Sequence, residues 1–442
     1  MKAVSVRLAL VLAAVCFRVA DVRAQVPIRL TLDEAIVRGV KASHRLAEID
    51  ARRDASQAAV EAREAADRPL VSLQAGYMRT NHVTEFAVLG PTGPPPRVLY
   101  PDVPDNLRSR VDLQWPIYAG GRTDALERAA RAEVDALGQD RAAAQADLKL
   151  EITRTYWALV TARASVQLLE EALTRMDAHL QDVRNRLAAG LVPPNDVLST
   201  EAQRSRQQML LIEARNLLES ATADLRRLTG LPADAPIEID ATLEPPAPAV
   251  TTPSALVGQA RADRPERRAL EIRTQGAEER EAAADAGRLP SLALAGGYDY
   301  ARPNAKIFPR AADWKTSWDV SVNLNWSLWD GGRVNAEVAE SAANRRAVEE
   351  RLREFDTVLE SDVRQRQLDL TSALAAIGSA EDGVRSATEA RRVVAERFGA
   401  GVATNTDVID AQLVLMQAAL DRTRAIANAR LAAARLDRAL GR

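Results

Sequence analysis

The sequence predicts a mostly α-helical protein that also contributes four strands to a membrane β-barrel. Three observations lead to this fold class: the two halves of the chain repeat each other, each half holds alternating segments rich in aromatic residues, and each half ends in long segments with heptad periodicity. We therefore expect long antiparallel coiled-coil helical hairpins joined to barrel strands, built as an internal tandem repeat.

The repeat is visible as identities at a fixed offset. Ten pairs lie 211 residues apart: Trp115/Trp326, Gly120/Gly331, Gly121/Gly332, Arg122/Arg333, Arg186/Arg397, Ala189/Ala400, Gly190/Gly401, Asp196/Asp407, Val197/Val408 and Gly230/Gly441. Three more lie 221 apart: Pro69/Pro290, Gly76/Gly297 and Tyr77/Tyr298. The ten additional residues fall in a Pro- and Gly-rich stretch of loop composition around residues 90–96.

The repeat sets the expected domain organisation. We predict a signal peptide over 1–24, a first structural repeat over 25–230, a Pro-rich connector over 231–253 and a second structural repeat over 254–442. Each repeat should contain a helix, two strands and a long helical hairpin. In the connector, Ile237 and Ile239 are candidates for a short strand.

The first 24 residues have the composition of a secretory signal peptide. Lys2 and Arg7 precede a short apolar run, Leu8 to Phe17, and Val22 to Ala24 offers a small-residue cleavage site. Cys16, the sole cysteine, would be removed with this segment. A lipid anchor at Cys16 is the less favoured alternative, because valine precedes it where lipoprotein signals carry a small residue. No later run approaches the ~20 apolar residues of a transmembrane helix.

Charge and motifs exclude several function classes. The chain has a formal net charge of −2, and residues 1–24 carry +3, so the remainder is acidic and a nucleic-acid partner is not expected. His44, His82 and His179 are scattered, and no phosphate-binding loop or nucleophile elbow is present. We therefore predict no catalytic, cofactor-binding or metal site, and no enzyme.

The strand segments alternate in polarity. Asp319 to Leu328 places Val320, Val322, Leu324, Trp326 and Leu328 on one face and polar residues on the other, and Arg110 to Trp115 alternates similarly. About ten residues suit a tilted strand that crosses a bilayer. Val71 to Arg79 and Leu292 to Tyr300 are the weaker partners.

Aromatic residues concentrate around these segments. Twelve of the 17 Phe, Trp and Tyr residues lie within 69–118 and 290–329, as aromatic girdles of a membrane barrel would place them. The alternative is a soluble β-sandwich with an aromatic core. Four strands in 442 residues are too few for a sandwich, so we favour the barrel.

Most of the remaining sequence is helical. Each repeat should open with a helix, Thr31 to Arg68 and Ser254 to Arg288, ended by a proline. A second helix, Arg122 to Ala189, would be roughly 100 Å long at ~1.5 Å per residue. The heptad positions of the first repeat are Ile152, Leu159, Val166, Leu173, Leu180 and Leu187, with Ala162, Leu169, Met176 and Val183 in a second seam. Those of the second repeat are Val363, Leu370, Ile377, Val384, Arg391 and Phe398.

Each long helix should end at a glycine cap, Gly190 or Gly401, and a second helix should run back. The returning helices are expected over Asp196 to Leu228 and Asp407 to Leu440. Because four strands cannot close a barrel and open strand edges are not tolerated in lipid, several chains must share one barrel. Two chains give eight strands with a filled interior, whereas three give twelve and leave room for a channel.

These features together resemble the TolC-type outer membrane efflux protein family. The resemblance rests on Thr31-Leu32-Asp33-Glu34-Ala35, on the duplicated Trp-x-x-aromatic-x-Gly-Gly-Arg turns at Trp115 and Trp326, and on the duplicated tips at Arg186 and Arg397. It implies a homotrimer with a twelve-stranded barrel in the outer membrane lipid and a twelve-helix tunnel in the periplasm. It also implies a passive conduit that docks by its helical tips onto a periplasmic adaptor and inner membrane pump, in efflux or type I secretion.

The resemblance also assigns candidate sites. Asp407 and Asp410 match the family's acidic rings at the periplasmic pore constriction, where three copies would bring six carboxylates together and attract cations. Helix capping is the alternative role for Asp407 and for Asp196. The family's hydrogen-bonded lock on the closed pore is expected to differ here, since this chain has Phe398 and Ala403 at the corresponding positions.

Two further sets of residues complete the predicted sites. The adaptor-docking tips are Arg186, Gly190, Leu191, Val192, Asn195, Asp196, Arg397, Gly401, Val402, Thr404 and Asn405. Leu191, Val192 and Val402 are expected to be exposed there and to contact a partner, and local packing of the hairpin is the alternative. The strand-to-helix turns are Gly120, Gly121, Gly331 and Gly332. The alternatives to the conduit are a stand-alone porin and a soluble coiled-coil envelope scaffold. The sequence leaves the cargo and the class of pump open.

Overall fold

The computed structural model describes residues 28–88, 93, 96–246 and 253–442. The helices are α2 (Leu32–Ala42), α3 (His44–Glu64), α4 (Arg122–Ala188), α5 (Pro194–Thr229), α6 (Pro253–Asp263), α7 (Pro265–Asp285), α8 (Arg333–Gly399) and α9 (Asn405–Ala439), with 3-10 turns η1 (Ala65–Asp67) and η2 (Ala286–Arg288). The strands are β1 (Ile28–Leu30), β2 (Leu70–Arg79), β3 (Phe86–Val88), β4 (Arg97–Tyr100), β5 (Asp105–Tyr118), β6 (Ile237–Ile239), β7 (Ser291–Arg302) and β8 (Lys315–Asn325). The predicted signal peptide and Cys16 lie outside the described residues.

The chain forms two compact units. The first, here called the helical unit, comprises the residues up to Leu46, 144–263 and 361–442, and the second, the strand unit, comprises 47–143 and 264–360. Each unit therefore takes segments from both sequence repeats. This follows from the repeat itself, because equivalent segments carry equivalent packing surfaces.

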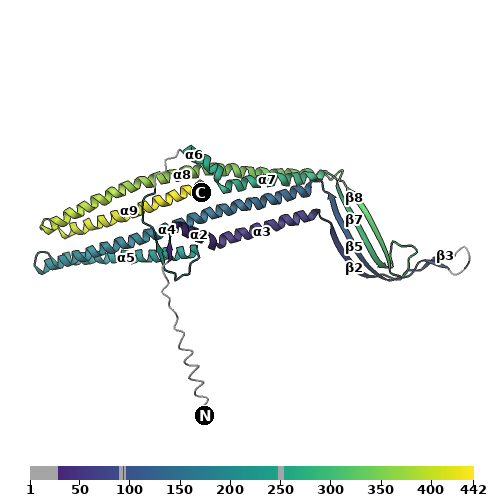
Figure 1. The fold of residues 1–442 in the computed structure, drawn as a ribbon, viewed down its shortest axis with the longest axis horizontal. Coiled ribbons are helices and arrows are strands. Elements are labelled where there is room, and N and C mark those ends of the chain that lie inside the picture. Colours follow the sequence, from purple (N-terminus) through teal and green to yellow (C-terminus); the bar gives the residue numbers. More distant parts are fainter. Residues whose placement is uncertain (1–27, 89–92, 94–95, 247–252) are drawn as a thin grey trace, which may run out of the picture. The chain divides into compact units, whose positions relative to one another are not determined.

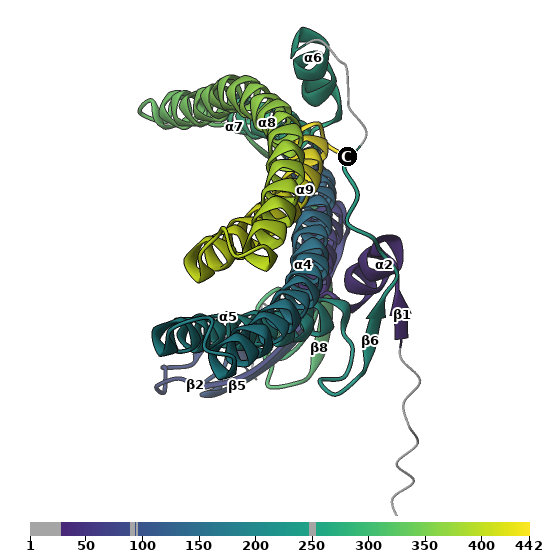
Figure 2. The same ribbon diagram turned by 90° about the vertical axis from the view of Figure 1, so that its left-hand side faces the viewer.

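The helical unit is built on the predicted heptad positions. Ile152, Met176, Val183 and Val363 are fully buried or nearly so, as side chains at a coiled-coil seam should be. Strands β1 and β6 pair in parallel, which confirms the predicted strand at Ile237–Ile239 (Figure 2). Thr31 and Glu34 form a capping box at the start of α2.

Four helices end at glycines that occupy equivalent places in the two repeats. Gly190, Gly230, Gly401 and Gly441 all have positive φ, between 66° and 86°. In each case the residue that follows the glycine donates its N–H to the carbonyl of the residue five positions earlier in the chain than the donor. Leu191 donates in this way to Arg186, and Val402 to Arg397, both at 2.9 Å. These are Schellman caps, which explains why the glycines recur.

The main sheet of the strand unit is antiparallel, with the strand order β2-β5-β7-β8 (Figure 1). The central pair, β5 and β7, comes from different repeats, and its register runs from Leu107↔Arg302 to Tyr118↔Leu292. The prediction that each repeat contributes two strands to one sheet is confirmed. Among the described strands, β2 and β8 each have a single neighbour in this sheet, so each leaves one edge unpaired.

The register separates the side chains of the sheet onto two faces. The apolar face carries exposed Val71, Leu73, Tyr77, Val111, Trp115, Tyr298, Tyr300, Trp318, Val320, Val322 and Leu324. The polar face carries Ser72, Gln74, Arg108, Arg110, Asp112, Gln114, Asp299, Asp319, Ser321, Asn323 and Asn325. Trp318 is 74% exposed and Val320 65%, so the apolar face lies uncovered in the single chain. A contiguous exposed apolar surface of this kind marks contact with a membrane or a protein.

Several predicted boundaries were wrong. The opening helix is broken after Ala42, because Ser43 is extended and its Oγ accepts the N–H of Leu46 to start α3. The opening helix of the second repeat is broken at Arg264, where the following Pro265 disfavours helical backbone.

Among the helices of the described residues, none has a stretch both long and apolar enough to cross a membrane.

The strands also differ from prediction. β8 ends at Asn325 and not at Leu328, because its partner β7 begins at Ser291, directly after Pro290, which has no N–H to donate. β1 and the short β3–β4 hairpin were not predicted. The hairpin lies between Tyr77 and Trp115, in the segment that is ten residues longer in the first repeat than in the second.

Candidate functional site

The predicted acidic residues at the tip of the second hairpin have different local roles. Thr404 and Asp407 form a capping box at the start of α9, in which the Thr404 N–H donates to Asp407 Oδ2 at 2.8 Å. This bond from the Thr404 backbone holds the pKa of Asp407 below its ordinary value of 3.8. Helix capping by Asp407 is therefore confirmed, and its carboxylate stays charged and exposed. Asp410 is exposed one turn further along α9.

Asp196, the equivalent of Asp407 in the first repeat, does not cap its helix. Pro193 is the N-cap of α5, without a side-chain cap bond, so the capping interpretation of Asp196 was wrong. Proline replaces the hydroxyl side chain that Thr404 supplies in the second repeat. Instead, the backbone carbonyl of Asp196 accepts bonds from Thr200 Oγ1 at 2.7 Å and from Asn405 Nδ2 at 3.1 Å.

A buried polar cluster joins the two hairpins near their tips. Asn405 is 3% exposed, and its Nδ2 donates to Thr200 Oγ1 and Ser199 Oγ as well as to Asp196. Its Oδ1 lies 2.8 Å from Nε2 of His179, which therefore donates the proton. Burial lowers the pKa of His179, so the neutral ring is favoured. Asn405 was expected in the docking surface. Its side chain is instead buried, with both polar atoms hydrogen-bonded inside the helical unit, so Asn405 is not part of that surface.

A second contact between the hairpins lies beside this cluster. The Arg186 guanidinium sits 4.3 Å from the centroid of the Phe398 ring and donates to the Phe398 carbonyl at 3.2 Å. The ring also packs edge-on against His179, with 5.4 Å between the ring centroids. Phe398 thus holds the hairpins together through its ring face and its carbonyl.

The tip turns divide into packed and exposed residues. Val192 packs against the cluster of Val183, Phe398 and Val408, so the expectation that its side chain is exposed was wrong. Leu191 and Val402 are 72% and 63% exposed. These two side chains, which occupy the first position after each glycine cap, form the apolar ends of the hairpins.

In the strand unit, equivalent tryptophans mark the ends of β5 and β8 nearest the helices. Trp115 Nε1 donates to the carbonyl of Asp67, and Trp326 Nε1 donates to that of Arg288, both at 3.1 Å. Each indole is therefore anchored by its polar edge while its ring stays about half exposed. Tryptophan at a membrane–water interface has this arrangement.

The predicted turn glycines follow these tryptophans. Gly120, Gly121, Gly331 and Gly332 all have φ between 66° and 89°, which explains why the pair is glycine in both repeats. At Gly120 a Cβ would also lie 2.9 Å from the Cβ of Leu289. Asp330 accepts the N–H groups of Gly332 and Val334, both at 2.9 Å, and so caps α8.

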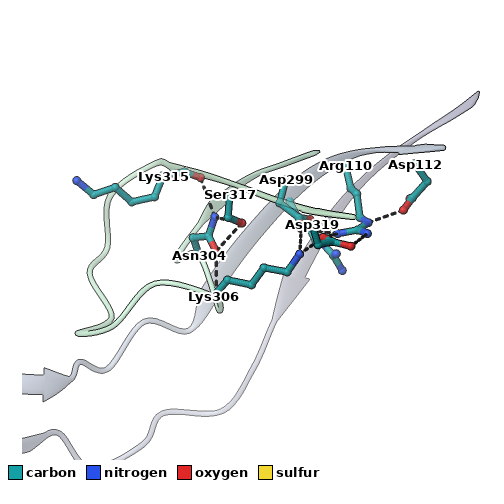
Figure 3. Close-up of polar contacts among 9 residues, drawn as sticks. Arg110, Asp112, Asp299, Asn304, Lys306, Lys315, Ser317 and Asp319 are labelled. Carbon is teal, nitrogen blue, oxygen red and sulfur yellow. Dashed lines mark hydrogen bonds and ion pairs between the residues drawn. The ribbon is translucent and has the colours of Figure 1, made fainter. Parts of the chain in front are cut away.

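The polar face carries an ion-pair network that sequence reasoning missed (Figure 3). Arg110 on β5 pairs with Asp112 and Asp299 at 2.5 Å each, and with Asp319 at 3.0 Å. Asp299, only 4% exposed, also pairs with Arg108 at 2.7 Å and Lys306 at 3.0 Å. The alternation of β5 and β8 indicated which face these residues share, but not that the strands lie close enough to connect them.

A close approach explains one of the duplicated glycines. The Arg110 guanidinium lies directly on Gly297, where a Cβ would be 2.0 Å from Nη2 and 2.3 Å from Cζ. Gly76, the equivalent residue in the first repeat, has open space at the same place. The recurrence of this glycine was a signal in the sequence, although its reason was not visible there.

Two features define the class of protein. The helical hairpins have exposed apolar ends, and the sheet has one lipid-compatible face and one charged face, as in a channel-forming protein. A family model described as outer membrane efflux protein matches residues 38–231 and 256–442. The chain belongs to the outer membrane efflux protein family. It is accordingly a channel protein of the outer membrane, with its helical hairpins in the periplasm.

Individual relatives agree with this assignment. Outer membrane protein TolC of Vibrio cholerae is 24% identical over 388 residues, covering 87% of this chain and 84% of that protein. Among solved structures, a membrane protein from Pseudomonas aeruginosa matches with a TM-score of 0.77 at 19% identity, covering 93% of both chains. The outer membrane protein VceC of Vibrio cholerae matches with a TM-score of 0.73 at 20% identity, covering 93% of this chain and 96% of that one.

Proposed function

We propose that three copies of this chain form one outer membrane duct, which passively conducts substrates delivered by an inner membrane pump through a periplasmic adaptor. The observation that carries the proposal is the sheet of the strand unit. It exposes a continuous apolar face and leaves one edge of β2 and one edge of β8 unpaired among the described strands. Unpaired backbone groups are not tolerated in lipid, so these edges need partners from other copies.

An assembly of three copies would pair the open strand edges and also leave room for an aqueous path. Joining β8 of one copy to β2 of the next closes a ring of twelve strands, with the apolar face toward lipid and the polar face toward the interior. Eight strands would leave an interior filled by side chains, whereas twelve leave space for an aqueous path. The Arg110 network then lies on the wall of that path.

The helical tips are the proposed docking site for the adaptor. Leu191 and Val402 project from the two turns, and apolar side chains at the end of a hairpin favour contact with another protein. Asn195, Asp196, Thr404, Gly190, Gly401 and Arg397 surround them in the same turns. Asp407 and Asp410 are both exposed on α9, and we propose that three copies of this pair form the acidic constriction at the periplasmic entrance.

Cysteine crosslinking tests the shared barrel. Cysteines at Gln74 on β2 and Ser321 on β8, joined by a bifunctional reagent in isolated outer membranes, should give covalent trimers. The matched control places cysteines at Gln114 and Ala295, which are directly paired within one chain and should crosslink only within the monomer.

The alternatives predict different outcomes. A stand-alone porin would give crosslinked monomers from both cysteine pairs. A soluble scaffold would be absent from the outer membrane fraction.

A further inference from the structure

The connection between β7 and β8, residues 303–314, is fastened onto the polar face of the sheet by its first residues. Asn304 is 3% exposed, and its Nδ2 donates to the carbonyl of Lys315 and to Ser317 Oγ, both at 3.0 Å. Its Oδ1 accepts the N–H of Lys306 at 2.9 Å. This arrangement turns the Lys306 side chain back toward the strands (Figure 3).

Lys306 then pairs with carboxylates of two strands. Its ammonium lies 3.0 Å from Oδ2 of Asp299 on β7 and also pairs with Asp319 on β8. Both acids belong to the polar face and are held from the other side by Arg110. These ion pairs hold the loop over the polar face. If the lysine pointed away from the sheet, Asp299 and Asp319 would each lose one of their cationic partners.

The second limb of the loop is fastened as well. Arg310 Nη1 donates to the Tyr100 hydroxyl at 2.6 Å, and the Arg310 guanidinium lies 4.7 Å from the centroid of that ring. Trp314 stacks on Tyr300, a residue of the apolar face, with 4.6 Å between centroids. Arg310 and Tyr100 line a hollow of about 630 Å³ together with Asn304, Lys306 and polar-face residues that include Asn106, Arg108 and Asp299.

We propose that Lys306 latches the loop over the exterior end of the duct, and that this latch sets the width and charge of the exit. The inference rests on the proposed function, in which the polar face lines the aqueous path. The strand ends that flank this loop are those opposite the helices, so the loop lies at the exterior end. Three copies of the loop would narrow the exit from three sides.

The latch also balances the charge of the network. Arg108, Arg110 and Lys306 offset Asp112, Asp299 and Asp319 within the cluster. Removing the lysine charge leaves each copy with one excess carboxylate, and three copies with three. A widened exit should therefore also become more selective for cations.

Labelling from outside intact cells tests the latch. Ser321→Cys places a thiol on the polar face two residues beyond Asp319, in a mature chain expected to have no other cysteine, and a bulky polar maleimide reports how easily the exit is passed. Lys306→Gln should raise the labelling rate severalfold, while Lys306→Arg, which keeps the cation, should label nearly as slowly as the parent. Lys315→Gln is the matched control, because that side chain points away from the network (Figure 3).

The outcomes separate the latch from the proposed function. If Lys306→Gln and Lys315→Gln label at the same rate, the latch is wrong and the duct stands. If Ser321→Cys is labelled only after cells are lysed, whatever the residue at 306, the polar face does not line a path to the exterior, and both fail. In case Lys306→Gln is not assembled, Asn304→Ala tests the same latch, since it releases the turn that aims the lysine.

Discussion

Alanine substitution at the two equivalent glycines, 297 and 76, isolates the contribution of the Arg110 network to the sheet. Both glycines lie in strands without positive φ, so the backbone accepts alanine at both. At Gly76 a Cβ meets nothing within 4 Å, whereas at Gly297 it would lie 2.0 Å from Arg110 Nη2. Gly297→Ala must therefore displace the guanidinium, and Gly76→Ala must not.

The magnitude follows from what Arg110 loses. Its side chain is 15% exposed and its partner Asp299 is 4% exposed, so these pairs are poorly screened by solvent, whereas Asp319 is 42% exposed and its pair counts for little. Asp299 keeps Arg108 and Lys306, so its charge is not stranded. A hydrogen bond to a charged group contributes about 1.5–3 kcal/mol, and we expect Gly297→Ala to cost about that amount. Gly76→Ala should change stability by less than about 0.5 kcal/mol.

Unfolding of the purified protein in detergent, followed by tryptophan fluorescence, measures both effects, because Trp115, Trp318 and Trp326 lie in or next to the sheet whereas the far-ultraviolet signal is dominated by the helices. A double-mutant cycle sharpens the test: in an Arg110→Gln background, Gly297→Ala should become as mild as Gly76→Ala. Equal effects of the two alanines in the parent protein, or an undiminished cost in the Arg110→Gln background, would refute the reasoning.

Three further predictions concern the helical unit. Asn405→Ala leaves the buried His179 Nε2 without its acceptor and should cost about 1–3 kcal/mol in chemical unfolding, against less than about 0.5 kcal/mol for Ser199→Ala at the exposed rim of the same cluster. Burial lowers the pKa of His179 in the folded state, so the unfolded chain binds the proton more readily. The free energy of unfolding should therefore be highest above the ordinary histidine pKa of 6.5 and fall as the pH drops below that value. A pH dependence that persists in His179→Gln would contradict this. Gly401→Ala forces alanine to φ +75° and should destabilise by about 1–2 kcal/mol, whereas Gly378→Ala inside α8 should stabilise by about 0.8–1 kcal/mol, so melting temperatures that shift in the same direction would count against the cap.

The repeat and the periodicities predicted the parts of the fold that local physics decides. The helix expected over Arg122 to Ala189 matches α4 to within one residue, since coiled-coil packing repeats along the whole helix. The alternation of polar and apolar residues placed the side chains of β5 and β8 on the correct faces of the sheet. Breaks such as Ser43 depend on single side-chain contacts, and the periodic pattern does not register them.

The candidate sites were predicted less completely, because their key contacts join distant residues. His179 and Asn405 are 226 residues apart in sequence, and Arg110 and Asp319 are 209 apart. Neither pairing has a local signature. The caps at Gly190 and Gly401 were predictable because a Schellman motif is made within one turn of the chain.

The central claim is that three chains share one barrel, and the mass of the native protein measures it most directly. The mature protein, extracted from outer membranes in mild detergent, should have three times the mass of one chain after the detergent contribution is removed, and should aggregate when detergent is withdrawn. A single-chain mass, in a protein that stays dispersed without detergent, would contradict the account.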